Sequence, residues 1–223
     1  MAPVAADRPE RVTRALAALA DRGFNFDPDQ ADHFTTANGW KVDDYAQPLP
    51  PEPPGPPRPG GSFEVAQQLM RDYAFADPAI LRAVYATDSP FERRDMLLEG
   101  RFWGLRFHLG VRVGGLVDDE LTLDGRPVRR WGWSYRTLQG HLEMGQMDYE
   151  VGKWLDSGEV EFRIHVVSRP AHIPNPVIRL GFRLFGRRVQ RRFARHACQR
   201  MARLTAAGAR AGAAVEDPPA TSS

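Results

Sequence analysis

The chain has 223 residues, of which 42% are hydrophobic and 26% are charged, and its formal net charge is +2. These values exclude a wholly disordered chain and a disulfide scaffold, and no uncharged apolar stretch approaches the length of a membrane span. Charges interrupt the N-terminus, which therefore lacks the apolar core of a signal peptide, and the single cysteine, Cys198, is typical of a reducing compartment. We therefore expect a cytoplasmic protein.

A proline-rich segment divides the chain. Eight of the twelve residues in 48–59 are proline, which favours extended polyproline II structure. We interpret it as a linker or a strap laid over the domain, and a ligand for a proline-reading partner is the alternative. The predicted parts are an N-terminal extension (1–47), the linker or strap (48–61), the main domain (62–207) and a disordered tail rich in Ala, Gly, Pro and Ser (208–223).

Short helices are predicted around this segment. Before it, the apolar face Val12, Ala15, Leu16 and Leu19 indicates one helix, and residues 39–45 then favour an extended segment. After it, Ser62 is predicted to cap a helix that carries Phe63, Ala66, Leu69, Met70 and Tyr73. Asp77-Pro78 is a second start signal, with an apolar face made of Ile80, Leu81, Val84 and Tyr85.

The middle of the chain alternates between apolar and polar residues, which predicts half-buried antiparallel strands. The alternation covers residues 105–113, 128–136, 147–151 and 160–166. Asp124-Gly125 is a strong hairpin signal before the second of these strands, and Ser168-Arg169-Pro170 ends the last one. We expect an antiparallel meander of five or six strands.

A long amphipathic helix is predicted after the strands. Its apolar stripe recurs at steps of three and four residues and includes Phe182, Phe185, Val189, Phe193, Ala197, Met201 and Leu204. Its other faces are mostly arginine, since residues 173–212 hold ten arginines and no lysine or acid. The arginines either pair with the more acidic remainder, the interpretation we favour, or bind an anionic membrane or nucleic acid.

The apolar stripe of this helix must be buried against the sheet, because no other element is available. A twisted sheet that curls around a helix encloses a cavity. We therefore predict an α+β fold in which a curved antiparallel β-sheet wraps around a long C-terminal α-helix. This order of elements resembles the helix-grip arrangement of the START-like (Bet v 1-like) superfamily, in which segment 39–45 would be the first strand. The resemblance implies a cavity for an apolar ligand.

A longer pattern resembles the bacterial and plant family known as domain of unknown function 1990. The pattern is Tyr-x-Thr-Leu-x-Gly-His-x-Glu-x-Gly, followed by a strand that ends in Ser-Arg-Pro. Its fixed positions are Tyr135, Thr137, Leu138, Gly140, His141, Glu143, Gly145, Ser168, Arg169 and Pro170. A carboxylate often follows the last glycine in that family, whereas Gln146 stands here. The resemblance spans about residues 62–206 and implies a fold but no reaction.

His141 and Glu143 are the best candidates for chemistry, because a neutral imidazole beside a carboxylate can act as a base or bind a ligand oxygen. The alternative, which we favour, is that they hold a turn shaped by Gly140 and Gly145. The candidate ligand-binding residues are Trp131, Trp133, Tyr135, Thr137, His165 and Arg169. A place in the hydrophobic core explains Trp131, Trp133 and Tyr135 equally well. Glu161, Arg163 and His165 are more typical of a solvated face, and Arg169 of a strand-ending turn.

No metal site or nucleotide cofactor is predicted. The histidines are scattered without an HxH or HxxH pair, and the chain has neither a Walker loop nor a GxGxxG motif. We predict that the domain binds a small apolar or amphipathic ligand with a polar or anionic head near His141 and Arg169. The alternatives are a cyclase, hydrolase or isomerase that uses His141 and Glu143, and binding of an anionic surface through the last helix.

Overall fold

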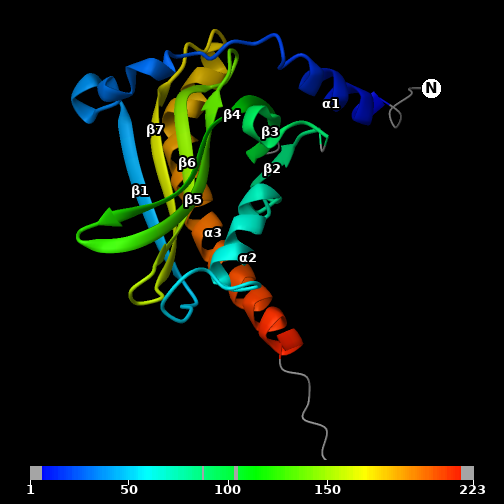
Figure 1. Ribbon diagram of the computed structural model, residues 1–223. Coiled ribbons are helices and arrows are strands. Elements are labelled where there is room, and N and C mark those ends of the chain that lie inside the picture. Colours follow the sequence, from blue (N-terminus) through cyan, green and yellow to red (C-terminus); the bar gives the residue numbers. More distant parts are fainter. Residues whose placement is uncertain (1–6, 87, 103–104, 217–223) are drawn as a thin grey trace, which may run out of the picture.

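An antiparallel sheet and a long C-terminal helix form the centre of the computed structural model, which describes residues 7–86, 88–102 and 105–216 (Figure 1). The sheet has seven strands in the order β1-β7-β6-β5-β4-β3-β2. The strands are β1 (Lys41–Leu49), β2 (Leu81–Val84), β3 (Asp95–Phe102), β4 (Leu105–Leu123), β5 (Arg126–Thr137), β6 (Glu143–Trp154) and β7 (Val160–Pro170). The helices are α1 (Asp7–Ala17), α2 (Ser62–Arg71) and α3 (Pro176–Glu216), with short 3-10 turns η1 (Pro28–His33), η2 (Thr36–Asn38) and η3 (Phe91–Arg93).

Helix α3 packs on one face of the curved sheet, and α2 packs beside it (Figure 1). Alternate residues are buried along most of β6 and β7, as period-two patterning requires, whereas residues 131–135 of β5 are all buried. Phe193, Ala197 and Met201 of α3 belong to the same core. This is the helix-grip architecture, and the predicted fold class and burial of Phe193 are confirmed.

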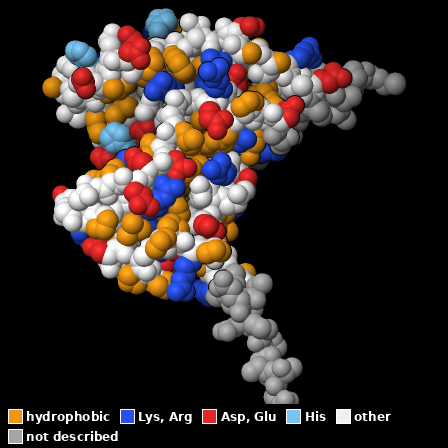
Figure 2. Space-filling view, viewed as in Figure 1, with side chains coloured by type: hydrophobic (Ala, Val, Ile, Leu, Met, Phe, Trp, Pro, Cys, Tyr) orange, Lys and Arg blue, Asp and Glu red, His pale blue; other side chains and the backbone are white. Residues whose placement is uncertain are grey.

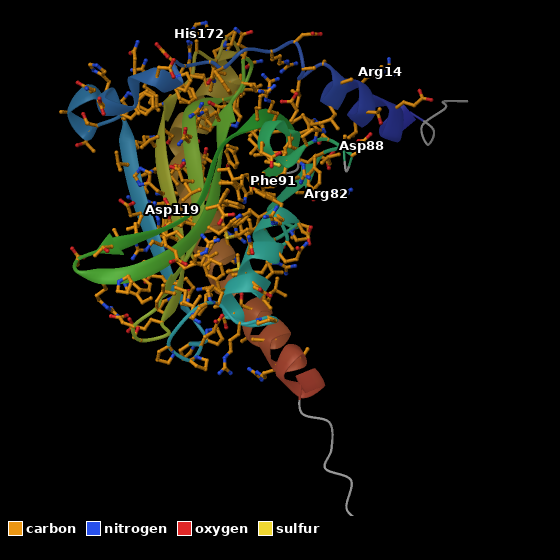
Figure 3. All side chains as sticks on the ribbon, in the orientation of Figure 1. Arg14, Arg82, Asp88, Phe91, Asp119 and His172 are labelled. Carbon is orange, nitrogen blue, oxygen red and sulfur yellow. The ribbon has the colours of Figure 1, made fainter. Side chains whose placement is uncertain are left out.

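The hairpin between β4 and β5 also forms as predicted. Asp124 and Gly125 both have positive φ, at 49° and 78°, and Leu123 pairs directly with Arg126. A two-residue loop with two positive φ values matches the twist of the flanking strands. The turn chemistry thus fixes the register of β4 against β5 as far as the irregularity between Val113 and Gly115. Asp119, labelled in Figure 3, lies in this part of β4.

The prediction of a helix after Asp77 is wrong. Asp77 does organise a turn, because its Oδ1 accepts a hydrogen bond from the Ala79 N–H at 2.9 Å. The chain then enters β2, which pairs with β3 at the edge of the sheet. Strand pairing therefore outweighs the local helix signal, and β2 and β3 raise the number of strands from the expected five or six to seven.

The proline-rich segment lies between two parts of the same fold. Strand β1 includes its first two residues, Pro48 and Leu49, which are therefore part of the sheet, and it pairs with β7 along its whole length. The sheet thus begins before residue 62, where the main domain was expected to start. The segment itself is held to the sheet by Glu52, whose carboxylate lies 2.6 Å from the fully buried Lys153 Nζ. Glu52 also accepts the Phe63 N–H at 2.8 Å, at the start of α2.

The C-terminal tail begins later than expected. Helix α3 continues through Gly208 to Glu216, because alanine is the strongest helix former and most of residues 206–214 are alanine. Residues 208–216, where the sequence predicts the start of a disordered tail, are helical in the structure, and residues 217–223 lie outside the described part of the chain. Among the described residues, no helix is long and apolar enough to cross a membrane.

Candidate functional site

A cavity of about 350 Å³ lies between the sheet and the N-terminal half of α3. The sheet contributes residues of β2 to β6, and α3 contributes one side of its first five turns. Nearly all of the lining side chains are apolar, including Leu98, Leu109, Met147, Phe185 and Phe193. The polar side chains in the lining are His141 and Glu143, from the predicted motif, and Gln190, from α3. The space therefore suits an apolar body with one polar contact.

Glu143 is the exceptional residue of this cavity. Its Oε1 is inaccessible to solvent and has no hydrogen-bond partner among the described residues. Its Oε2 accepts only a long bond, 3.4 Å, from the Gln190 amide. Burial raises the pKa of the Glu143 carboxyl to about 7, against the opposing effect of the Lys41 and Arg187 charges. A buried oxygen without a partner is costly in a folded protein, so its presence at a cavity wall points to a ligand.

His141 has a structural role in addition to its place in the cavity wall. Its Nδ1 lies 2.9 Å from the Glu143 backbone nitrogen, which donates to it. The same Nδ1 lies 2.9 Å from the Glu143 carbonyl oxygen, to which it donates in the other tautomer of the neutral ring. Burial lowers the pKa of His141 to about 4, so the ring is neutral at physiological pH. The structure thus places both predicted candidates at one cavity, with the imidazole also holding the turn.

Thr137 and Gly145 form the support behind Glu143. The Thr137 hydroxyl accepts the Gly145 N–H at 2.9 Å and lies 2.6 Å from Asn25 Oδ1, and Asn25 Nδ2 donates to the Glu143 carbonyl. Gly145 has a φ of 152°, and a Cβ there would lie 2.0 Å from the Val167 carbonyl oxygen. Thr137, predicted as a ligand contact, therefore lies behind the wall and positions the strand that carries Glu143.

The aromatic residues of β5 divide between core and cavity. Tyr135 lines the cavity, whereas Trp131 and Trp133 do not and are 0% and 2% exposed. The ring of Phe91, labelled in Figure 3, packs edge-on against Trp133 with the centroids 5.5 Å apart. Tyr135 sits beside two further buried tyrosines, and burial raises its pKa to about 12. Its hydroxyl is thus a neutral group at the end of the cavity.

His165 and Arg169 lie outside the cavity. His165 Nδ1 is 2.7 Å from Asp44 Oδ1 on the neighbouring strand, with its side chain 44% exposed. The Arg169 guanidinium lies 5.0 Å from the centre of the Trp40 ring, also on the outer side. Side chains alternate between the two faces of a strand, and these residues occupy the face opposite to α3. A ligand head at Arg169 is therefore excluded for this cavity.

Sequence reasoning missed the polar partner on α3. Gln190 donates to Ser168 Oγ at 3.2 Å as well as to Glu143, so it links the helix to both motif strands. The available signal was an uncharged polar residue between two members of the apolar stripe, Val189 and Phe193. The members of that stripe were assigned to a core, but Phe182, Phe185 and Val189 line the cavity.

Charged groups outside the cavity are mixed in sign. Basic and acidic side chains intersperse on the face shown in Figure 2. On α3, Arg187 forms an ion pair with Asp43 of β1, and Arg200 donates to the Ala74 carbonyl. Among the described residues, no three His, Cys, Asp or Glu side chains gather as metal ligands would.

Comparisons with solved structures find proteins of similar topology at very low identity. A START superfamily protein from Mycobacterium smegmatis is 8% identical with a TM-score of 0.40, over 72% of this chain and 94% of the other. A protein from Thermus thermophilus is 8% identical with a TM-score of 0.42, over 75% and 97%. Ginseng major latex-like protein 151 from Panax ginseng is 11% identical with a TM-score of 0.39, over 70% and 97%.

The comparison with curated proteins finds no match. A family model, in contrast, matches residues 29–200, well over half of the chain, and it includes β1 as well as the motif around Glu143. The chain belongs to the family described as Domain of unknown function (DUF1990).

Proposed function

We propose that the protein binds a small apolar or amphipathic ligand in the cavity between the sheet and α3. The observation that carries the proposal is the unpartnered Oε1 of Glu143 at the wall of an otherwise apolar space. The volume, about 350 Å³, lies within the range of small-molecule sites. A ligand with an apolar body and a hydroxyl or amine donor satisfies both features.

The proposed head group is narrower than the polar or anionic one expected from the sequence. An anion beside Glu143 would be repelled once the carboxyl ionises, near pH 7. A hydrogen-bond donor, in contrast, is accepted by the carboxylate and gives it the partner it lacks. The polar contact inside the cavity is therefore assigned to a donor group rather than to an anion.

Filling the cavity tests the proposal. Tryptophan at Val189, on α3, or at Leu109, on the sheet, projects into the same space from opposite walls. We expect each variant to lose binding of the dye 1-anilinonaphthalene-8-sulfonate and of ligands captured from a lipid extract, as followed by native mass spectrometry. The matched control, Arg192→Trp, adds the same ring to the exposed side of α3 and keeps binding.

Thermal melts separate a filled cavity from a damaged fold. A filled cavity keeps or raises the melting temperature, so loss of binding in a folded variant supports the proposal. Unchanged binding in both folded filling variants, or no binding by the wild type, overturns it.

An acid–base enzyme is the second candidate, favoured by one observation. The pKa of Glu143, raised to about 7, suits a group that gives and takes a proton at neutral pH. The test compares ligands recovered after long incubation with the wild type and with Glu143→Gln. A ligand altered only by the wild type supports a hydrolase, cyclase or isomerase, whereas an unchanged ligand supports binding alone.

A further inference from the structure

A second pocket, of about 540 Å³, lies on the other side of α3. It is bounded by the start of β1, the segment that follows β7 and the first three turns of the helix. Its walls combine apolar side chains, including Ile173 and Leu180, with the cations of Lys41, Arg179 and Arg187. None of the described residues that line it is acidic. It therefore differs from the first cavity in both place and charge.

Two of these cations have no close partner among the described residues, although the Lys41 charge also acts on Glu143 at longer range. Arg187 is paired with Asp43, but within the described ranges the Lys41 ammonium and the Arg179 guanidinium have no ion pair or side-chain hydrogen bond. Lys41 is partly buried and Arg179 is exposed, so an anion that reaches both is only partly screened by water. Charged donors of this kind bind carboxylate and phosphate groups.

The two pockets share one wall, the Phe182 side chain. Its ring lies over Gly186, one turn further along α3, where an added Cβ would approach the ring to 2.8 Å. The absence of a side chain at Gly186 therefore allows the ring to stand between the pockets. Leucine or alanine at this position would stabilise a helix better than glycine, so helix propensity does not explain the residue.

We propose that the two pockets hold a single anionic amphiphile, with its apolar chain in the first cavity and its anionic head at Lys41 and Arg179. This inference rests on the proposed function and names the ligand class, an alkyl chain that ends in a carboxylate or phosphate. The chain passes Phe182, which separates the apolar space from the basic one. The head stays away from Glu143, whose free oxygen remains available for a donor on the chain, such as a hydroxyl.

The experiment compares probes that share a chain or a head. Dodecanoate and dodecyl phosphate carry chain and anion, dodecanol carries the same chain with a neutral hydroxyl donor, and acetate and inorganic phosphate carry the anion alone. Isothermal titration with the wild type is expected to show at least one of the two charged amphiphiles binding about tenfold or more tightly than dodecanol, the effect of one charge-assisted contact. The tighter of the two identifies the head group.

Variants at the basic pocket locate the head. We expect Lys41→Met and Arg179→Met each to weaken the charged amphiphile by about tenfold and to leave dodecanol unchanged. The control Arg192→Met removes a cation from the exposed side of the same helix and leaves both affinities unchanged. Native mass spectrometry is expected to show one amphiphile per chain, and thermal melts verify that each variant is folded.

The outcomes separate this inference from the proposed function. If dodecanol binds but the charged amphiphiles bind no more tightly, or if Lys41→Met and Arg179→Met have no effect, the second pocket is not a head-group site and the cavity proposal stands. Binding of acetate or phosphate alone as tightly as the amphiphile, or two amphiphiles per chain, also overturns the shared site. If no amphiphile binds, the shared site fails, and the cavity proposal is decided by its own test with the dye and the lipid extract.

Discussion

Breaking the buried ion pair between Glu52 and Lys153 is expected to destabilise the protein more than any exposed charge does. Lys153 is 0% exposed and its Nζ donates to Glu52 Oε2 at 2.6 Å and to the Pro56 carbonyl at 2.8 Å. In Lys153→Met the carboxylate stays buried with only the backbone N–H groups of Phe63 and Arg58 as donors. Removing one partner of a buried pair costs about 3–5 kcal/mol.

The lower end of that range applies, because those two backbone donors continue to stabilise the carboxylate. We expect Lys153→Met to lose about 3 kcal/mol of the roughly 5–15 kcal/mol of a typical domain. Adding Glu52→Gln removes the stranded charge, so the double variant is expected to be more stable than Lys153→Met alone. Equilibrium urea unfolding, followed by tryptophan fluorescence, measures all three free energies.

The matched control is an exposed pair near the same end of the sheet. Arg126 contacts Asp156 at 2.8 Å, with side chains 38% and 42% exposed. Arg126→Met is expected to cost much less than Lys153→Met, because exposed ion pairs contribute little to stability. Equal losses for Lys153→Met and Arg126→Met, or a double variant less stable than Lys153→Met, would refute the reasoning from burial.

Three further predictions concern the cavity and its support. The pKa of Glu143 is raised from its ordinary value of 4.5 to about 7, so the stability that its protonated carboxyl contributes is lost as pH rises through 7. The pKa of His141 is lowered from 6.5 to about 4, so the stability that its neutral ring contributes is lost as pH falls through 4. Between pH 4.5 and 6.5 the two slopes offset, and Glu143→Gln is expected to lose about 1.4 kcal/mol per pH unit on acidification in urea melts; a profile parallel to the wild type's contradicts this. Phe193→Ala is expected to cost about 3–5 kcal/mol and its exposed neighbour Arg192→Ala under about 1 kcal/mol; equal small losses would mean that α3 does not pack on the sheet. Gly145→Ala is expected to cost about 3 kcal/mol or more, because its φ of 152° and the adjacent β7 carbonyl leave no room for a Cβ; a melting temperature equal to the wild type's would contradict the close approach.

Local patterns predicted the parts of the fold that depend on local chemistry. The Asp124-Gly125 turn and the period-two strands are examples, because turn geometry and side-chain alternation are properties of a few adjacent residues. Strand β2 escaped prediction because its four residues are stabilised by pairing with β3, which no local signal encodes. The Asp77 turn forms, but the residues after it pair with β3 as strand β2 and form no helix.

The sequence predicted the motif that carries the candidate site, but not the other residues that line it. The spacing of His141 and Glu143 indicated two polar groups at a bend, and both line the cavity. The contribution of α3 was hidden, because cavity-lining and core residues carry the same apolar pattern. The second pocket depends on Lys41 and Arg179, which are 138 positions apart in the sequence and meet only through the fold.

The order of strands in the sheet has a consequence for synthesis on the ribosome. Among the described strands β1 pairs with β7 alone, so Lys41 finds its partner Ser168 only after more than a hundred further residues have been made. Until then the early strand presents unpaired backbone groups to other chains, a template for aggregation. Contacts so distant in sequence also slow folding. We therefore expect nascent or C-terminally truncated chains that end before β7 to depend on chaperones more than the completed chain does.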